Sequence, residues 1–219
     1  MKDHSVLTLV IGNKRYSTWS LRPWILLKEF GVPFQEIVIP LYREDSKGAL
    51  LAHSPAGKVP ILHDGETSVW DSLAIIEYVA ELYPDLPIWP RKRETRAHAW
   101  ALACEMHSGF GALRSECSMN FGRAPRPISL TETARADAAR IDAAWRDALA
   151  RHGGPFLFGQ FSAADAMFAP VVQRFETYVI PVSQEAQRYM DAIKSLESWK
   201  EWSLSAKSEE WRLPQYERD

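Results

Sequence analysis

Short apolar runs and helical repeats alternate along the first part of the chain. Residues 6–12 ("VLTLVIG") and 34–39 ("FQEIVI") are apolar runs of strand length. Between them, residues 20–31 have the spacing of a helix, with Ser20 near its N-cap and Gly31 at its end. A strand–helix–strand unit makes its two strands parallel, so the pattern predicts a parallel pair at the start of a sheet.

The next residues add a short helical segment, a hairpin and a second clear helix. Residues 44–53 are polar and are predicted to be partly helical. Residues 59–70 are predicted to form two short strands joined by Asp64-Gly65, and residues 71–83 have the amphipathic pattern of a helix. A two-residue turn makes the last two strands antiparallel. The expected order is therefore βαβαββα, an α/β arrangement around a small mixed sheet.

The pattern changes after residue 83. Residues 84–94 contain three prolines followed by basic residues, a composition that disfavours a helix interior and is typical of a linker. We expect an α/β domain over residues 1–83, a linker over 84–93 and an all-helical domain of about five helices over 94–219. The helical spacing recurs in four segments separated by Gly and Pro, at residues 95–116, 129–154, 162–180 and 183–206.

Composition and charge narrow the class of protein. The 219 residues are 46% hydrophobic and 25% charged, an ordinary globular mixture. The formal net charge is −2, so no overall charge would attract nucleic acid or an anionic membrane surface. No apolar run approaches the roughly 18 residues that a membrane span requires. We therefore expect no nucleic-acid or membrane partner, and a small molecule or another protein instead.

Cysteine usage favours a reducing compartment. The chain has two cysteines, Cys104 and Cys117, and neither belongs to a metal-ligand spacing or a disulfide-rich pattern. The N-terminal apolar stretch is too short for a secretory signal. The expected location is the cytoplasm, with two free thiols and no bound metal.

Polar residues stand where the first domain could bind a ligand. Ser17 comes just before the first helix, and Asp71-Ser72 stands at the start of the helix at 71–83. Unpaired N–H groups and the helix dipole stabilise an anion at such places, but helix capping is the structural alternative and local sequence leaves both open. Val59-Pro60 opens a strand, and a cis bond there could present backbone groups to a ligand, although most X–Pro bonds are trans.

Taken in order, four motifs resemble those of the cytosolic glutathione transferases: "YSTWSLRPW", "SPAGKVPIL", "DSLAIIEYVAELYP" and "FSAADAMFAP". The resemblance covers nearly the whole chain, with a first half similar to the family's thioredoxin-like domain and a second half similar to its helical domain. In the fourth motif, Ser162 and Asp165 fit a helix-capping box, which is a folding element. The resemblance implies a homodimeric detoxification enzyme that uses glutathione as co-substrate, without a metal, to attack a small electrophile.

The same resemblance assigns the glutathione-binding residues. Val59 is expected to pair its backbone with the cysteinyl part of glutathione, beside a cis Pro60. Asp71 and Ser72 are expected to hold the γ-glutamyl end. Lys58 could reach the glycyl carboxylate, although a lone lysine is more often a solvated surface charge.

Two residues compete for the role of activating the glutathione thiol. The stretch "STWSLRPW" is most similar to the Ser-type motif of the zeta and theta-like classes, and matching register puts the activating serine at Ser17. Tyr16 is the alternative, because other classes use a tyrosine. No cysteine lies near residues 15–24, which argues against the classes that use a nucleophilic Cys.

The electrophile is expected against the helical domain. By the resemblance, the first long helix of that domain lines the electrophile pocket, so Met106, His107, Phe110 and Arg114 are candidates by position, although core or surface is the default interpretation of each. Trp19, from the stretch "RYSTWSLRPW", could form a further wall of the site. A cation such as Arg114 would favour a dicarboxylate, so glutathione-dependent cis–trans isomerisation of a maleyl-type acid is an alternative activity. A glutathione- or ligand-binding protein without catalysis is the remaining alternative, since the same fold can serve binding alone.

Overall fold

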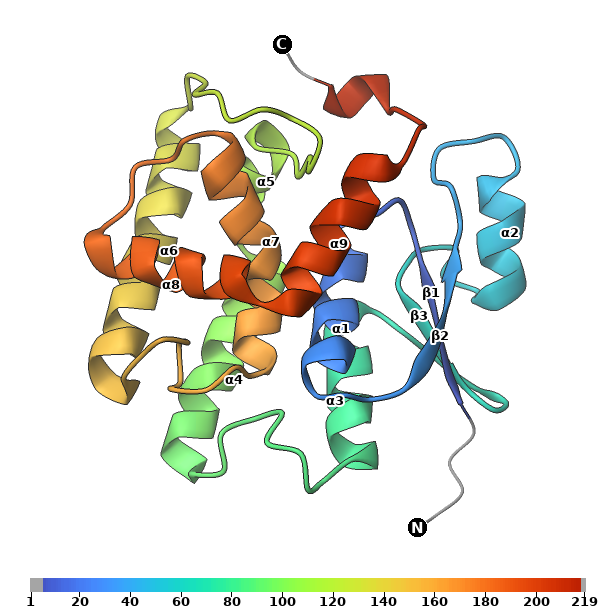
Figure 1. The fold of residues 1–219 in the computed structure, drawn as a ribbon, viewed down its shortest axis with the longest axis horizontal. Coiled ribbons are helices and arrows are strands. Elements are labelled where there is room, and N and C mark those ends of the chain that lie inside the picture. Colours follow the sequence, from blue (N-terminus) through green and yellow to red (C-terminus); the bar gives the residue numbers. More distant parts are fainter. Residues whose placement is uncertain (1–5, 218–219) are drawn as a thin grey trace.

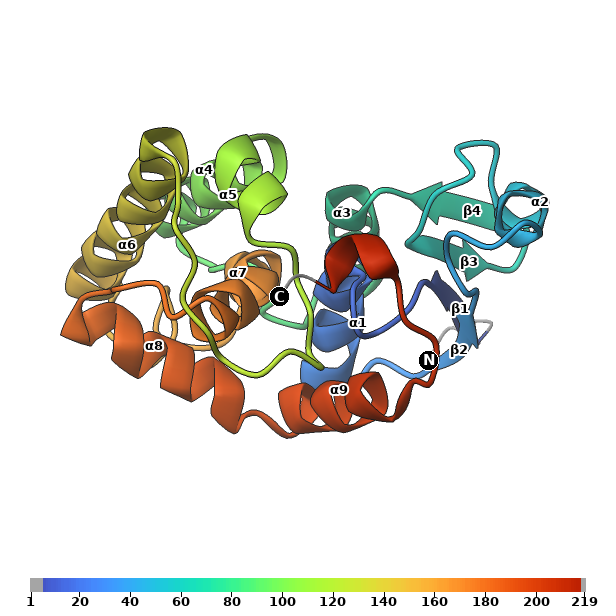
Figure 2. The ribbon, with the colours of Figure 1, turned by 90° about the horizontal axis from the view of Figure 1, so that it is seen from above.

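The computed structural model describes residues 6–217. A four-stranded sheet with three helices forms one side of the molecule, and the helices that follow in the chain form the other (Figures 1 and 2). The strands lie in the order β2-β1-β3-β4. Their bounds are β1 Leu7–Ile11, β2 Phe34–Val38, β3 Ile61–Asp64 and β4 Thr67–Trp70.

The pairing of the strands follows the predicted topology. β1 and β2 are parallel, whereas β1 pairs with β3 and β3 with β4 in antiparallel fashion. The predicted small mixed sheet is therefore confirmed. The hairpin turn is one residue further along than expected, because Asp64 still pairs with Thr67 and the turn residues are Gly65 and Glu66. Gly65 has a φ of +57°, which suits a tight hairpin turn.

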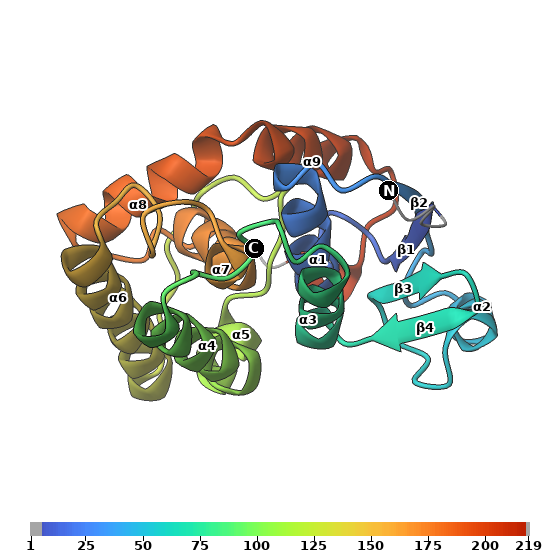
Figure 3. The same cartoon turned by 90° about the horizontal axis from the view of Figure 1, so that it is seen from below.

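Helices cover both faces of the sheet. α1 (Thr18–Glu29) and α3 (Ser72–Leu82) lie on the face turned toward the helical part, and α2 (Ser46–His53) lies on the opposite face (Figure 3). The strand side chains alternate accordingly: Leu9 belongs to the large core on the α1 side, and Val10 belongs to a small cluster with Leu50 of α2.

α1 starts earlier than the sequence pattern suggested. Its first residue is Thr18 and its N-cap is Ser17, three residues before Ser20, which was expected near the N-cap. Ser20 is instead in the first turn, where its hydroxyl points back to the end of β1 and accepts the N–H of Gly12 at 3.1 Å. The predicted end at Gly31 is confirmed: this residue has a φ of +63°, which ends the helix at little steric cost.

Six α-helices follow residue 92 in the described part of the chain, against about five expected. They are α4 (Arg93–Ser108), α5 (Gly111–Glu116), α6 (Glu132–His152), α7 (Ala163–Thr177), α8 (Gln184–Ser195) and α9 (Glu197–Ser208). Two of the four predicted helical segments are divided: Phe110, with a φ of +58°, separates α5 from α4, and the extended backbone of Leu196 separates α9 from α8. A short 3₁₀ helix, η1 (Pro214–Tyr216), ends the described residues near the start of α1 (Figure 2).

One hydrophobic core runs through both parts of the molecule. It includes Leu9 of β1, Trp24 of α1, Phe168 of α7 and Trp202 of α9. The rings of Trp24 and Trp202 meet edge to face, with centroids 5.0 Å apart. α1 is therefore fixed by packing on both sides, and the residues at its N-terminus are held on a rigid support.

The start of α7 carries the predicted capping box. The Asp165 carboxylate accepts the N–H of Ser162 at 2.9 Å, the Oγ–H of Ser162 at 2.8 Å and the N–H of Leu157 at 3.0 Å. Asp165 is fully buried, so it binds a loop and a helix start together inside the core. None of the helices within residues 6–217 is long and apolar enough to cross a membrane.

Candidate active site

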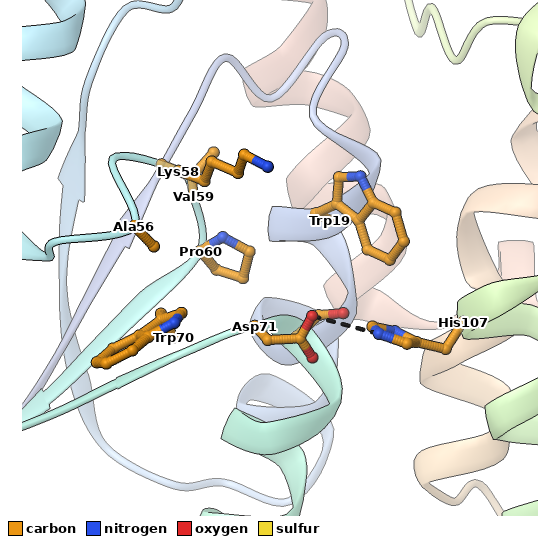
Figure 4. A pocket seen from close by; sticks show the side chains of 9 residues that line it. Trp19, Ala56, Lys58, Val59, Pro60, Trp70, Asp71 and His107 are labelled. Atoms are coloured by element: carbon orange, nitrogen blue, oxygen red, sulfur yellow. Dashed lines mark ion pairs between the residues drawn. The ribbon is translucent and has the colours of Figure 1, made fainter.

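Two neighbouring cavities, each of about 510 Å³, share Trp19, Lys58 and Val59 in their walls. The first, called here the Asp71 cavity, has all five residues predicted to bind glutathione in its wall: Lys58, Val59, Pro60, Asp71 and Ser72. Trp19 and His107 face them from the other side (Figure 4). The second, called here the Ser17 cavity, is lined by Tyr16, Ser17 and Tyr216 among others.

Val59 and Pro60 lie where the chain enters β3. Their peptide bond is cis, as the resemblance implied, and Pro60 is buried while Val59 is half-buried in the cavity wall. Lys58 is exposed and extends across the Asp71 cavity toward Trp19 (Figure 4). The backbone of residues 58–60 therefore forms one rim of both cavities, with a positive charge at the opening.

Ser17 is the N-cap residue of α1, but its hydroxyl does not cap the helix. The Ser17 Oγ donates to the Oγ of Ser20 at 2.7 Å, and Ser20 is itself fixed by the N–H of Gly12. A serine hydroxyl has one proton and two lone pairs, so Ser20 can donate to Ser17 once Ser17 turns its own proton toward a ligand. The structure thus removes the capping alternative for the Ser17 side chain and leaves its hydroxyl in the wall of a cavity.

Tyr16, the other candidate for activating a thiol, has its hydroxyl engaged elsewhere. Its O–H donates to a carboxylate oxygen of Glu217, and its oxygen accepts the N–H of Leu213 at 3.3 Å. Burial, followed by the contact with Glu217, raises the pKa of Tyr16 to about 12. A phenol has a single proton, so in this arrangement Tyr16 has none to give to a thiolate.

Asp71 connects the N-terminus of α3 to helix α4. Its Oδ1 accepts the N–H groups of Leu73 at 2.9 Å and Ala74 at 3.4 Å, so the predicted capping takes place. Its Oδ2 lies 3.3 Å from the Nε2 of His107 on α4. The backbone φ of Asp71 is +77°, a conformation that residues other than glycine adopt rarely and that clusters at functional sites. Capping and ligand binding are compatible here, because each uses a different oxygen.

Ser72 has an unsatisfied hydroxyl. It is the first residue of α3 and is fully buried, and its Oγ has no hydrogen-bond partner within residues 6–217. Because buried polar groups are nearly always paired, an unpaired hydroxyl in a cavity wall points to a ligand atom. The N-terminus of α3 adds a partial positive charge, so this corner of the Asp71 cavity suits a carboxylate.

Trp19 is the side chain around which the two halves of the site meet. The ring of His107 approaches it edge-on, with centroids 5.4 Å apart. Two guanidinium groups also contact its face: the central carbon of Arg22 lies 4.2 Å and that of Arg114 lies 5.2 Å from the ring centroid. The predicted wall residue Trp19, which lines both cavities, therefore also contacts two cations.

Arg22, Arg114 and the nearby Arg174 of α7 hydrogen-bond to backbone carbonyls, and not to carboxylates, in the described part of the chain. No ion pair within 4.0 Å to Arg22, Arg114 or Arg174 occurs in the described part of the chain, and the Nη1 of the fully buried Arg22 has no partner there. Burial is the main cause that lowers the pKa of Arg22 to about 9, followed by repulsion from Arg114 and Arg174. Burial also lowers the pKa of Arg114, partly offset by Asp137. The region beside Trp19 thus has a surplus of positive charge.

Three predicted electrophile residues line neither cavity: Arg114, which lies against Trp19, and the two core residues Met106 and Phe110. Met106 is 1% exposed and belongs to the hydrophobic core, and Phe110 is buried in the same core at the break between α4 and α5. Neither side chain lines either of the two cavities. Met106 and Phe110 were candidates because of their position along the helix, and that position does not show which face of α4 turns to the cavity. The α4 residue that lines the Asp71 cavity is His107.

Sequence reasoning missed the supporting roles of Ser20 and Tyr216. The signal for Ser20 was available, because residues three apart on a helix share a face and Ser17 and Ser20 have that spacing. No local signal exists for Tyr216, which lies 199 positions beyond Ser17 in the chain and enters the Ser17 cavity only through the fold. The homodimer, the domain bounds and the absence of a metal stay predictions.

Family models match both parts of the chain. The glutathione S-transferase N-terminal domain matches residues 16–82, and the glutathione S-transferase C-terminal domain matches residues 123–203. The first match contains Ser17, Val59 and Asp71, the residues around which the two cavities are built. The chain belongs to the glutathione S-transferase family.

Curated relatives and solved structures agree with this assignment. A probable maleylacetoacetate isomerase from Caenorhabditis elegans is 36% identical over 99 residues, which is 45% of each chain. A zeta-class glutathione S-transferase from Euphorbia esula is 29% identical over 159 residues, or 71% of each chain. A crystal structure of a glutathione transferase homolog from Burkholderia with bound glutathione has a TM-score of 0.71 at 24% identity, covering 93% of this chain and 99% of that one. The thioredoxin-like fold with a helical C-terminal part is thereby confirmed.

Proposed function

We propose that the chain is a glutathione transferase that ionises the glutathione thiol at Ser17. The arrangement of hydroxyl groups supports this proposal: Ser17 can turn its proton into the cavity, whereas Tyr16 donates its proton to Glu217. When Ser17 turns, the hydroxyl of Ser20 can donate to the Ser17 oxygen from behind, and a chain of hydrogen bonds strengthens each member.

The required stabilisation is within reach of these groups. A free thiol has a pKa of about 8.5, and lowering it by ~2 units requires ~2.7 kcal/mol of preferential stabilisation of the thiolate. A hydrogen bond to a charged acceptor contributes roughly 1.5–3 kcal/mol, and a helix N-terminus adds about 0.3–1 kcal/mol. Ser17 at the start of α1 supplies both.

The reaction then needs no further acid or base from the protein. The thiol proton leaves to solvent, and the sulfur lone pair forms a bond to the electrophilic carbon. The bond from that carbon to its leaving group breaks, and the leaving group departs with the bonding electrons. The protein's contribution is thiolate stabilisation together with proximity of the two reactants.

Charge complementarity sets the orientation proposed for glutathione. The carboxylate of the γ-glutamyl end fits the unpaired Ser72 hydroxyl and the N-terminus of α3, and its ammonium group fits the Oδ2 of Asp71. The glycyl carboxylate fits Lys58 at the rim. The cysteinyl part then runs along Val59, which lines both cavities and so leads from Asp71 toward Ser17.

Replacing Ser72 with alanine tests this orientation. The variant is expected to raise the KM for glutathione about 10-fold, the equivalent of about 1.4 kcal/mol for one lost hydrogen bond to a carboxylate. The kcat at saturating glutathione is expected to stay within about 2-fold, because Ser72 is not at the thiol. Ser68→Ala is the matched control, since it removes a hydroxyl on β4 that donates to the carbonyl of His53 at the end of α2. An unchanged KM in Ser72→Ala would contradict the orientation.

Conjugation assays test the proposed function as a whole. With glutathione and a panel of electrophiles such as 1-chloro-2,4-dinitrobenzene, the purified protein is expected to accelerate thioether formation. Binding of glutathione without a thiolate absorbance band and without conjugation of any electrophile would instead identify a ligand-binding protein.

Glutathione-dependent cis–trans isomerisation of a maleyl-type acid is a second candidate. It is favoured by the cations beside Trp19, which have no carboxylate within ion-pair distance in residues 6–217, and by the similarity to a probable maleylacetoacetate isomerase. In this reaction the thiolate adds to one carbon of the double bond and the electron pair moves onto the conjugated carbonyl as an enolate. Rotation about the new single bond and reversal of the addition regenerate the thiolate, so no atom is gained or lost.

A comparison of acidic and neutral electrophiles separates the two activities. If the acid is the substrate, Arg114→Met is expected to raise its KM about 10-fold, because a charge-assisted hydrogen bond is lost, and to change that of a neutral electrophile by less than about 2-fold. Arg140→Met is the control, since it removes an arginine paired with Glu105 on the outer side of α4 and α6. Equal effects on both electrophiles, or no turnover of maleyl-type acids, would exclude the isomerase.

A further inference from the structure

The residues after α9 hold the loop that leads to Ser17. Residues 209–217, called here the closing segment, begin with Glu209, whose two carboxylate oxygens accept the N–H groups of Lys14 at 2.6 Å and Arg15 at 3.0 Å. Tyr16 makes the next contacts with this segment: its hydroxyl donates to the Glu217 carboxylate and accepts the N–H of Leu213. The three residues before Ser17 are therefore each tied to the closing segment.

The closing segment also reaches the opposite rim of the Ser17 cavity. The hydroxyl of Tyr216 lies 2.9 Å from that of Tyr42, which comes from the loop before α2, and the rings of Tyr216 and Tyr16 are 5.5 Å apart. The carbonyl of Tyr216 accepts from the side-chain amide of Asn120 at 3.2 Å. Tyr216 thereby becomes part of the cavity wall (Figure 2 shows η1 near the start of α1).

Little apolar surface fixes this segment. Leu213 is its one buried residue in the part of the chain that the structure describes, and Glu217 and Tyr42 are exposed. A segment with few buried apolar contacts opens locally more easily than a core helix does. Its closed position therefore depends on a small number of polar contacts, and the hydroxyl of Tyr16 makes two of them.

We propose that Tyr16 is a positioning residue that latches the closing segment over the Ser17 cavity. The contacts of Tyr16 with Glu217 and Leu213 keep Tyr216 in the cavity wall, so opening of this latch sets how fast a glutathione conjugate leaves. The part that concerns conjugate release rests on the proposed glutathione transferase function; the latch itself does not. Tyr16 and Ser17, although adjacent, thus have separate tasks.

Trypsin cleavage tests the latch without glutathione. Arg212 is exposed within the closing segment, and cleavage after it requires the segment to leave its position. Tyr16→Phe and Glu217→Ala are each expected to accelerate cleavage after Arg212 about 3- to 10-fold, because one hydrogen bond to a charged group is lost. The double variant is expected to be no faster than the faster single variant, since both remove the same bond. Tyr78→Phe, which removes a tyrosine–carboxylate hydrogen bond to Asp64, is the matched control.

Conjugate release provides the second readout. Dissociation of S-hexylglutathione, followed by stopped-flow tryptophan fluorescence, is expected to be about 3- to 10-fold faster in Tyr16→Phe and Glu217→Ala, because both variants lose the hydrogen bond between Tyr16 and Glu217. The pKa of bound glutathione is expected to be unchanged in both. If cleavage is faster in the two variants but the unaltered protein does not bind glutathione, the latch is upheld and the proposed function is refuted. Unchanged cleavage in Glu217→Ala, or a bound thiol whose pKa rises in Tyr16→Phe, would overturn the latch.

Discussion

Replacing Ser17 with alanine is expected to raise the pKa of bound glutathione by about 1–2 units and to lower kcat at pH 6.5 about 5- to 50-fold. The reason is the loss of one hydrogen bond to a thiolate, which contributes roughly 1.5–3 kcal/mol, while each pKa unit corresponds to about 1.4 kcal/mol. Alanine can adopt the extended backbone conformation that Ser17 has at this N-cap, and the Ser17 hydroxyl does not cap α1. The helix is therefore expected to stay intact. The KM for glutathione is expected to change little.

The measurement combines a pH profile of kcat with an ultraviolet titration of the bound thiolate. Ser198→Ala is the control, because it removes a buried serine hydroxyl of α9 that lines neither cavity. Wild-type behaviour of Ser17→Ala together with loss of the thiolate in Tyr16→Phe would reassign the thiol to Tyr16.

Replacing Asp165 with alanine is expected to lower the free energy of unfolding by about 3–4 kcal/mol. Three buried donors, two from Ser162 and one from Leu157, lose their acceptor together, and each buried unsatisfied group costs roughly 1–3 kcal/mol, partly relieved by entering water. Burial raises the pKa of Asp165 to about 6, so the carboxyl is ionised at pH 7.5, where the comparison is made. The melting temperature is expected to fall by about 6–16 °C.

Thermal and denaturant unfolding at pH 7.5 measure this effect. Asp191→Ala is a matched control on an exposed part of α8, and we expect a change of less than about 0.5–1 kcal/mol there because exposed ion pairs contribute little. If the two variants unfold alike, the capping box is not the folding element that its contacts indicate.

The fold was largely predictable because its local signals agree with its packing. Leu9 and Val10 alternate between two sides of the sheet, Gly31 ends a helix where the sequence placed the end, and the hairpin turn at Gly65 lies within one residue of its predicted position. The errors lie where packing overrides local preference. Phe110 adopts a positive φ and divides α4 from α5, which no helical periodicity reveals, and Ser20 belongs to the first turn of α1 because Ser17 takes the cap position.

The site was predictable only where a motif fixes position in both sequence and space. Val59, Asp71 and Ser72 line one cavity because they stand at element ends, where the backbone sets their location. Residues of α4 were harder, since their role depends on how the helix is rotated: His107 faces the cavity and Met106 the core. The contacts of Tyr16 with Leu213 and Glu217 bridge distant parts of the chain, and no local pattern could predict them.

The pKa of glutathione bound to the unaltered protein tests the central claim most directly. Titration of the saturated complex, followed by thiolate absorbance, is expected to give a bound thiol pKa of about 6.5, ~2 units below the usual pKa of about 8.5 for a free thiol. A bound thiol that titrates at the same pKa as glutathione free in solution would contradict the account, because Ser17 and the start of α1 would then not stabilise the thiolate.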